Sequence, residues 1–504
     1  MATNNQTKTL IFFSLISVIC IISSAHLQSH KNGFISVTIS EKGLDFVKDF
    51  LIDKAVSSIT PLELPDIEKT VKIILIGKVK VVLSNIVIYH IDVSKSKVEL
   101  DDDGVTITAS KATANLSMDW MYTYKNWLVQ VTDKGKAFVQ VEDLEVELTT
   151  GLKNKEGSLK LSVEESKCDV DDIDIKVEGG ASWLYQGLVD AFSDHIENAV
   201  EKAILGKINE GVSKIGSLLA SLPKEIKVDD TSELNVTFVG DPILDDASIG
   251  FMINGLFIPT HGALSSPHLH QISKHSTPCY DHPKMIAMSL HEDVFNSASA
   301  VYFNAGLMKW RVDKIPDQSL LNTTKWIEVA PQLYKQYPND KMVLDILSSS
   351  PPSVRVSDGK MEATVSGDVT INVLNDGEVI PVACVSLAFS ASGFATISGN
   401  NLTGGIDLNE FSLSAKWSKI GNLQIDVIEP MISEVLKDGL LPQLNLFLMQ
   451  GFPLPLIHGF QLRDAKVVYA NSAITVCSDV VFVEDLQFST KYSFQNILNF
   501  GLFM

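Results

Sequence analysis

The segment "KAFVQVEDLEVEL" (136–148) alternates apolar and polar residues over most of its length. A period of two places successive side chains on opposite faces of a β-strand. Between about residues 70 and 178 the same period recurs in "VKVVL", "GVTITA", "SLKLSV" and "DIDIKV", with Gly, Asp, Asn and Lys between these segments. The sequence therefore predicts a long antiparallel meander in this region.

Helical patterns flank the meander on both sides. The first begins near Ser40 and ends before Pro61, and its apolar positions recur at helical spacing: Leu44, Val47, Leu51, Ala55. The second lies in residues 179–208, with one apolar face: Tyr185, Leu188, Val189, Phe192, Ile196, Ala199, Val200, Ala203. In the first helix Phe46 and Phe50 lie outside this apolar face, so the helix has apolar side chains to bury on more than one side.

The second half of the chain repeats this order of elements. A short helix is predicted at 292–306, followed by strands at 354–374 and 404–418 and a helix at 423–448 that is interrupted at Pro430 and Pro442. Alternating strands close the chain after residue 451, and we expect them to pair with those near 232–258. Because 504 residues exceed what one core of about 250 to 300 residues holds, we expect two domains.

Charge and targeting signals narrow the class of protein. The net charge of -20 argues against a nucleic-acid binder, and every arginine lies at or beyond Arg311, so a basic patch in the first half must consist of lysine. An apolar run after Lys8 followed by small residues predicts a signal peptide (1–25), hence a secreted, soluble chain. Four sequons after the expected signal peptide predict a glycoprotein: Asn115, Asn235, Asn322, Asn401.

No catalytic motif is present: there is no G-x-S-x-G, no H-E-x-x-H and no phosphate loop, so we expect no enzyme and no cofactor. A loop from about 259 to 284 gathers histidines beside Cys279: His261, His268, His270, His275, His282. Their spacing matches no closed zinc site, so we expect a solvated connector without metal, although a local pH response is an alternative. The four cysteines left after signal removal allow three connectivities that the sequence does not rank.

Four ordered motifs are similar to those of the bactericidal/permeability-increasing protein and lipopolysaccharide-binding protein (BPI/LBP) family, especially its plant branch: "ISEKGLDF" (39–46), "GGASWLYQGLVDAF" (179–192), "SLLASLPKEIKVDD" (217–230), "GFPLPLIHGFQL" (451–462). The resemblance covers roughly residues 34–482. It implies an α+β fold, an elongated boomerang of two similar antiparallel β-barrels, each wrapped with long helices and joined by a central antiparallel sheet.

The implied domains are an N-terminal lipid-binding barrel (34–222), a central sheet with the His-rich linker (223–288), a C-terminal lipid-binding barrel (289–453) and return strands to the central sheet (454–482). The remaining tail (483–504) is expected to be disordered. Each barrel would hold the acyl chains of one phospholipid. In the N-terminal barrel the pocket helices would contribute apolar residues: Leu44, Val47, Leu51, Leu188, Phe192, Ile196.

The family also carries a disulfide from a cysteine ahead of the second long helix to one within it. Cys168 stands at the first position, but the helix here has no cysteine, so this bridge should be missing. Cys279 with Cys477 is then a candidate pair, because both are expected near the central sheet.

The resemblance places a lysine-rich cluster at the tip of the N-terminal barrel. Lys72, Lys78 and Lys125 match its basic positions, and Trp120 takes the place of its tryptophan. The family often has basic residues where this chain has Asp119, Met121 and Tyr124. The tip of this chain therefore has fewer basic groups and more aromatic rings. We expect an outward row of aromatic side chains that docks on lipid: Trp120, Tyr122, Tyr124, Trp127. The alternative is that Trp120, Tyr122 and Tyr124 pack inward as core.

Two functions follow from these expectations. The first is a lipid-binding protein that recognises lipopolysaccharide or related amphiphilic lipids in innate defence against bacteria. The second is an extracellular carrier that transfers phospholipid without a recognition role, and an esterase is a remote third. The expected partners are lipopolysaccharide or phospholipid and, peripherally, membrane surfaces; the sequence does not give the oligomeric state.

Overall fold

The computed structural model describes residues 33–73, 77–101, 104–125, 127–178, 185–261, 279, 284–328, 330–457, 459–470 and 472–483. The chain forms two compact units. The N-terminal unit contains Ile39–Leu222 and Asp241–Gly250, and the C-terminal unit contains the rest of the chain. The expected signal peptide, all histidines of the linker except His261, and the tail after residue 483 lie outside the described residues.

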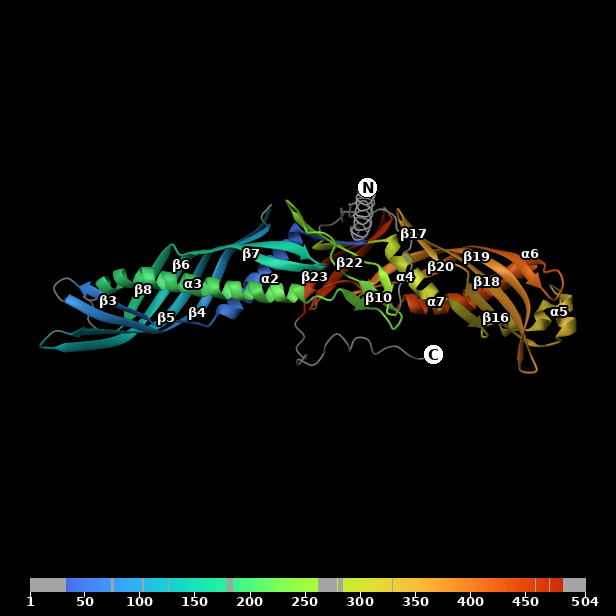
Figure 1. Cartoon of the computed structure of the whole chain (residues 1–504), viewed down its shortest axis with the longest axis horizontal. Coiled ribbons are helices and arrows are strands. Elements are labelled where there is room, and N and C mark those ends of the chain that lie inside the picture. The colour runs from blue at the N-terminus through green and yellow to red at the C-terminus, as the bar shows by residue number, and fades with distance from the viewer. Residues whose placement is uncertain are drawn as a thin grey trace, which may run out of the picture. The chain divides into compact units, whose positions relative to one another are not determined.

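The N-terminal unit is built on one antiparallel sheet with the strand order β2-β4-β5-β6-β7, in which β3 also pairs with β4 and β8 with β6 (Figure 1). The strands are β2 (Leu62–Leu64), β3 (Ile67–Ile73), β4 (Gly77–Asp101), β5 (Gly104–Lys125), β6 (Gln130–Lys155), β7 (Ser158–Asp169) and β8 (Asp172–Glu178). Consecutive strands β4 to β7 are neighbours in the sheet, which confirms the predicted meander.

Two helices belong to this unit, α2 (Glu41–Ile59) and α3 (Tyr185–Ala220). Ser40 caps α2, because its hydroxyl accepts a hydrogen bond from the backbone N–H of Gly43 at 3.4 Å. The longer α3 extends along the strands of the sheet in Figure 1, and it contacts β3, β7 and β8. The apolar side chains between α3 and the sheet form the core of the unit.

The C-terminal unit contains a second long antiparallel sheet with the order β15-β16-β18-β19-β20-β21, and β17 pairs with β18. Its strands are β15 (Lys309–Val312), β16 (Lys341–Ser348), β17 (Ser353–Ser357), β18 (Lys360–Asn375), β19 (Glu378–Ser398), β20 (Asn401–Ser418) and β21 (Phe452–Pro453). The helical segments are α4 (Glu292–Asn304), η2 (Gln318–Leu321), η3 (Thr323–Trp326), α5 (Pro331–Gln336), α6 (Ile425–Val435), η4 (Leu436–Leu440) and α7 (Leu441–Leu448).

The predicted interruption of the last helix needs a correction. Pro430 lies within α6, as its sixth residue, and Pro442 lies in the first turn of α7. The interruption is the π-helical turn η4 between them. Proline is tolerated in a first turn because the backbone N–H groups there have no helical partner, whereas inside α6 it removes one hydrogen bond without ending the helix.

A six-stranded sheet has the order β11-β12-β1-β14-β23-β22. The strands are β1 (Ile35–Ser40), β11 (Ile243–Asp245), β12 (Ser248–Ile253), β14 (Ile286–His291), β22 (Phe460–Ala470) and β23 (Ala473–Phe482); a separate sheet contains β9 (Glu225–Lys227), β10 (Ser232–Asn235) and β13 (Phe257–Pro259). The direct partner of the terminal strands is therefore β14, through Ile286–His291, and the expected pairing with residues 232–258 is wrong. The strand that follows the His-rich loop, β14, is thus the one that pairs with β23.

The α+β class and the two similar halves are confirmed, but the expected barrels need a correction. Among the described strands neither long sheet closes on itself, since β7 and β2 end one sheet and β15 and β21 end the other. In the N-terminal unit α3 contacts the end strands β2 and β7. In this unit α3 thus covers the face of the sheet that would lie inside a closed barrel.

Cys279 and Cys477 form a disulfide with their Cα atoms 6.0 Å apart, which is the candidate pair suggested above. Cys168 and Cys384 are free and buried, so the family's helix bridge is missing, as expected. No helix in the described part of the chain is long and apolar enough to cross a membrane.

Candidate functional site

The inner face of β5, which packs against α3, carries a continuous row of buried side chains. Every second residue from 112 to 122 is at most 8% exposed: Ala112, Ala114, Leu116, Met118, Trp120, Tyr122. Leu116 is paired with Ile88 of β4 on one side and with Val139 of β6 on the other, and all three are almost fully buried. The period-two pattern therefore extends across three strands as one apolar surface.

The helix α3 supplies the opposite wall of this surface. Phe192, Ile196, Val200 and Ile204 are 0 to 3% exposed and belong to the same apolar cluster as the inner face of the sheet. The cluster also contains five alanines, here called the alanine seam: Ala112, Ala114, Ala137, Ala199, Ala203. Alanine is smaller than leucine or isoleucine, so each of these five positions contributes little side-chain volume to the layer between α3 and the sheet.

The predicted pocket residues of α2 and α3 divide into three groups. Leu44 is 8% exposed and Leu51 is half-buried, while Phe192 and Ile196 are buried as expected. Val47 is 36% exposed, so its predicted inward position is wrong. The side chain of Leu188 lies outside the described residues.

Lys48 takes the buried position on α2 that sequence reasoning gave to Val47. It is 7% exposed, and its Nζ lies 3.1 Å from a carboxylate oxygen of Asp45 and 3.2 Å from one of Asp49. Burial alone would lower the pKa of Lys48, but the two carboxylates outweigh it and raise that pKa. A stem of four methylene groups can cover apolar surface while its charge stays paired, which a hydrophobicity pattern does not register.

The outward row of rings at the tip also needs a correction. Trp120 and Tyr122 are only 4% and 8% exposed and belong to the core cluster, and half-buried Tyr124 packs against it. The Nε1 of Trp120 donates to the backbone oxygens of Lys136 and Glu178 at 3.1 and 3.3 Å, so the one polar group of the ring is satisfied inside the fold. The alternative interpretation, that these rings are core, therefore holds for Trp120 and Tyr122.

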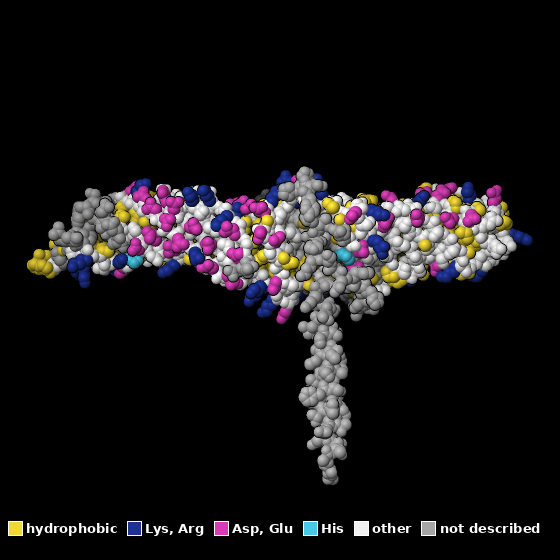
Figure 2. Space-filling model, turned by 90° about the horizontal axis from the view of Figure 1, so that it is seen from above, with side chains coloured by type: hydrophobic (Ala, Val, Ile, Leu, Met, Phe, Trp, Pro, Cys, Tyr) yellow, Lys and Arg dark blue, Asp and Glu magenta, His cyan; other side chains and the backbone are white. Residues whose placement is uncertain are grey.

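Trp127 differs from the other rings. It is 89% exposed, and the next two residues, Leu128 and Val129, are 67% and 51% exposed. These three residues, called the apolar turn below, connect β5 to β6. Figure 2 shows hydrophobic side chains gathered at the end of the unit where β5 and β6 meet, with basic side chains beside them.

Three lysines lie next to the apolar turn. Lys72 of β3 is the direct cross-strand partner of Lys78 of β4, and Lys125 follows Tyr124, which pairs with Val79. The three side chains are exposed, and none of them has an ion pair or a hydrogen bond within the described residues. Like charges placed opposite each other in a sheet repel, and an anion near this lysine row would reduce that repulsion.

The C-terminal unit has a comparable apolar layer. Val369, Ile371, Ala383 and Ala391 on β18 and β19 are fully buried in one cluster with Ile428, Ile432 and Val435 of α6. The sheet and the α6–η4–α7 stretch therefore form the same kind of helix-covered inner face as in the first unit.

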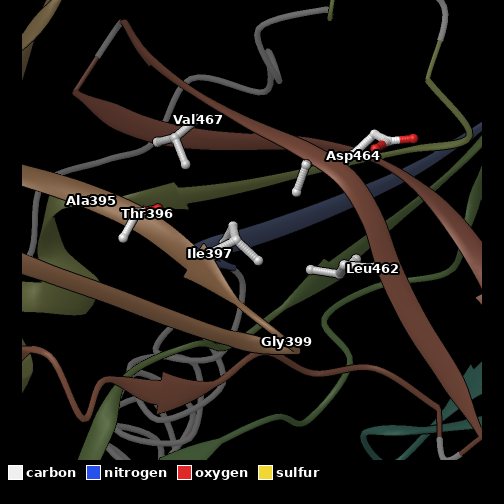
Figure 3. A pocket seen from close by; sticks show the side chains of 8 residues that line it. Ala395, Thr396, Ile397, Gly399, Leu462, Asp464 and Val467 are labelled. Atoms are coloured by element: carbon white, nitrogen blue, oxygen red, sulfur yellow. The ribbon is translucent and has the colours of Figure 1, made fainter.

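Two hollows lie away from both inner faces. The first, of about 380 Å³, lies between the end of β19 and β22, and Figure 3 shows Ile397, Leu462 and Val467 turned into it. The second is acidic and lies on β4 to β7, with these lining residues: Glu99, Asp101, Thr106, Glu147, Thr149, Glu164, Glu165. No group of three or more His, Cys, Asp or Glu in the described part of the chain could hold a metal ion.

The four sequons occupy different surroundings. Asn235 is the last residue of β10, and Asn322 lies between η2 and η3; their side-chain oxygens accept hydrogen bonds from the N–H groups of Thr237 and Thr324 at 3.0 and 2.9 Å. Asn115 lies within β5, and Asn401 begins β20. Glycosylation at these asparagines stays a prediction.

Comparison with known proteins gives consistent matches along most of the chain. Residues 43–215 match the N-terminal domain model of the LBP / BPI / CETP family, and residues 226–482 match its C-terminal domain model. A BPI/LBP family protein of Arabidopsis thaliana is 49% identical over 460 residues, which are 90% of this chain and 94% of that protein. The bactericidal permeability-increasing protein of Sebastes schlegelii is 27% identical over 467 residues, 90% of this chain and 96% of its own length.

Among solved structures, a crystal structure of lipopolysaccharide binding protein superimposes with a TM-score of 0.61 at 20% sequence identity. The match covers 90% of this chain and all of the other. At this level of identity the likeness concerns the fold.

Proposed function

Because this chain belongs to the LBP / BPI / CETP family and, within it, to the plant BPI/LBP branch, we propose that it is a secreted lipid-binding protein that holds acyl chains on its inner faces and recognises lipopolysaccharide or related amphiphilic lipids in innate defence. The observation that carries the proposal is the alanine seam between α3 and the sheet, in a unit whose tip carries the lysine row. The alanine seam suits the apolar acyl chains of a lipid, and the lysine row suits its phosphate groups.

The seam supports the apolar part of the proposal. Its alanines share one layer with large residues such as Phe192 and Ile196, so acyl chains that enter there are covered by both the helix and the sheet. Each methylene group moved out of water contributes about 0.8 kcal/mol. A lipid with two long acyl chains therefore gains enough to offset a modest separation of α3 from the sheet.

The lysine row supports recognition over simple transport. A carrier that only encloses acyl chains needs no charge at the tip, whereas three neighbouring lysines without ion pairs favour a ligand that bears phosphate. Lys72, Lys78 and Lys125 are therefore assigned to the headgroup, and the inward Trp120 and Tyr122 to the wall of the pocket. Secretion and glycosylation belong to the same proposal, through the signal peptide and the sequons.

Filling the seam tests the proposal. In an Ala114→Leu, Ala137→Leu variant the added side chains would occupy the room assigned to lipid. We expect less lipid on the purified variant, measured by mass spectrometry of an organic extract, and unchanged stability of the lipid-free form. If the seam is closed core instead, overpacking costs about 1 to 3 kcal/mol of stability while bound lipid stays the same, and that result would contradict the proposal.

A further inference from the structure

The hollow between β19 and β22 lies where two strands of the C-terminal unit, from different sheets, come close without pairing. One wall is the end of β19 in the long sheet, and the other is β22, the last strand of the six-stranded sheet. The volume of about 380 Å³ lies within the range of about 300 to 1,000 Å³ that is usual for ligand sites. Figure 3 shows apolar side chains of both strands turned into this space.

β19 has a neighbouring strand on only one side at this end. Its pairing with β18 stops at Gly393, whereas its pairing with β20 continues to Ser398. On the other side the hydroxyl of Tyr469 accepts a hydrogen bond from the N–H of Ala395 at 2.7 Å and donates to the carbonyl oxygen of Ala395 at 3.3 Å. Because this direction repeats every second residue, the N–H and C=O of Ile397 also point away from β20. Neither group has a hydrogen-bond partner within the described residues.

β22 presents a similar set of backbone groups. It pairs with β23 on one side, and on the other side the carbonyl oxygen of Tyr469 accepts from the N–H of Gly359 at 3.0 Å. By the same alternation Val467 turns its N–H and C=O to this second side. The described part of the chain offers no partner for these two groups either.

Side chains bridge the two strands at both ends of the hollow. Tyr469 forms the bridge at one end, as described above. At the other end Asn400, from the turn after β19, bonds through its side-chain amide to the backbone of Phe460 and Leu462 at 2.8 and 3.0 Å. Bridging by side chains places the strands farther apart than the spacing of about 4.8 Å between paired strands. The hollow is therefore a slot between two strand edges that are unpaired at Ile397 and Val467.

The lining of the slot indicates the class of ligand. An acyl chain would cover the unpaired backbone groups without offering them a hydrogen bond, which is unfavourable, whereas an extended peptide supplies N–H and C=O groups to both edges. Ile397, Leu462 and Val467 provide apolar contacts for side chains of such a peptide. The exposed carboxylate of Asp464 has no ion pair within the described residues, so it favours a basic side chain.

We propose that this slot binds an extended segment of a partner protein as an added strand. The backbone of the segment pairs with Ile397 on β19 and with Val467 on β22, its apolar side chains lie in the hollow, and a lysine or arginine pairs with Asp464. The site uses no residue of the alanine seam or of the lysine row. The inference therefore goes beyond the proposed function, which concerns lipid alone.

Titration calorimetry of the full-length protein with two peptides tests this inference. The probe is a capped hexapeptide that alternates valine and lysine, and the control peptide is the same hexapeptide with N-methylated valines. N-methylation removes backbone donors and keeps the charge, which matters because a protein with a net charge of -20 attracts any basic peptide. We expect saturable one-to-one binding of the probe and at least about tenfold weaker binding of the control peptide.

A pair of variants tests the role of the carboxylate. Asp464→Asn removes the charge and keeps a side chain that tolerates the φ of +51° at this position. The matched control is Asp376→Asn, because Asp376 is also exposed, has a φ of +50° and lies in the turn between β18 and β19. We expect the Asp464 variant to bind the probe about fivefold more weakly, and the Asp376 variant to bind it as the unaltered protein does.

Amide hydrogen exchange locates the bound peptide. The probe should slow exchange in residues 395–398 and 463–468, where the backbone groups gain partners. Equal affinity for the two peptides would overturn the inference, because binding would then not use backbone hydrogen bonds. An equal loss in the two aspartate variants, protection confined to other segments, or no saturable binding of the probe would overturn it as well.

Discussion

Trp120 and Tyr122 stack on the inner face of β5, with their ring centroids 6.0 Å apart and their planes 2° from parallel. The indole N–H of Trp120 is bonded to two backbone oxygens of the neighbouring strands β6 and β8. The pair is therefore part of the apolar inner face, whereas Trp127 is exposed.

The two tryptophans should respond in opposite ways to the same substitution. Trp120→Ala removes a buried ring and its hydrogen bonds, so we expect a loss of about 3 to 5 kcal/mol in the free energy of unfolding. Trp127→Ala removes an exposed ring and should change that free energy by less than about 0.5 kcal/mol. Urea unfolding of both variants checks this difference. A large loss in the Trp127 variant would mean that the turn packs against protein.

Gly135 should tolerate no side chain. It is paired with Trp120, and a Cβ at this position would lie 2.7 Å from the indole ring and also meet the backbone oxygen of Glu178. Because the ring is held by hydrogen bonds and the oxygen belongs to the backbone, neither yields easily, and we expect Gly135→Ala to cost about 1 to 3 kcal/mol. Gly206→Ala is the control, since nothing lies within 4 Å of its Cβ position. Thermal unfolding that ranks Gly206→Ala below Gly135→Ala would contradict the packing of this corner.

Residues 79–83, 104–109 and 136–148 illustrate what could be predicted from the sequence. Their period of two predicts strands because alternation is a local property of each segment. The α2 cap at Ser40 is equally local. Such features need no knowledge of what packs against them.

Residues 47, 48 and 120 illustrate what could not be predicted from the sequence. An amphipathic stripe drawn through Val47 misses Lys48, because a paired ammonium on a long apolar stem is counted as polar. For Trp120 the period of two fixes only that alternate residues share a face of the strand, and it does not say which face is covered. Trp120 faces inward because it packs in the same cluster as α3 and because its N–H binds carbonyl groups of β6 and β8. These partners are distant from Trp120 in the sequence.

The disulfide should contribute measurably to the stability of the C-terminal unit. It closes a loop with a sequence separation of 198 residues between Cys279 and Cys477, and it ties the end of the His-rich loop to β23. A Cys279→Ser, Cys477→Ser variant should lose about 2 to 5 kcal/mol. Unfolding in urea with and without a reductant is the measurement, and indifference of the unaltered protein to the reductant would show that the bond is absent or carries no stability.

Cys168 should resist alkylation in the native state. Burial first of all, and then the negative charges of Glu201 and Asp169, raise the pKa of its thiol to about 12. A raised pKa keeps the thiol protonated, so at pH 8 the reactive thiolate is scarce and the sulfur is also covered. Mass spectrometry after iodoacetamide treatment should find Cys168 unmodified until urea unfolds the chain. Rapid labelling at pH 8 without denaturant would contradict the packing of β7 against α3.

If acyl chains of a lipid occupy the inner faces, the purified protein should carry lipid. The full-length chain, purified without detergent, is extracted with organic solvent, and the extract is quantified by mass spectrometry. We expect acyl-chain lipid on the order of one molecule per unit, and less in the Ala114→Leu, Ala137→Leu variant. An extract with no more lipid than that of an unrelated secreted protein purified in parallel would contradict it.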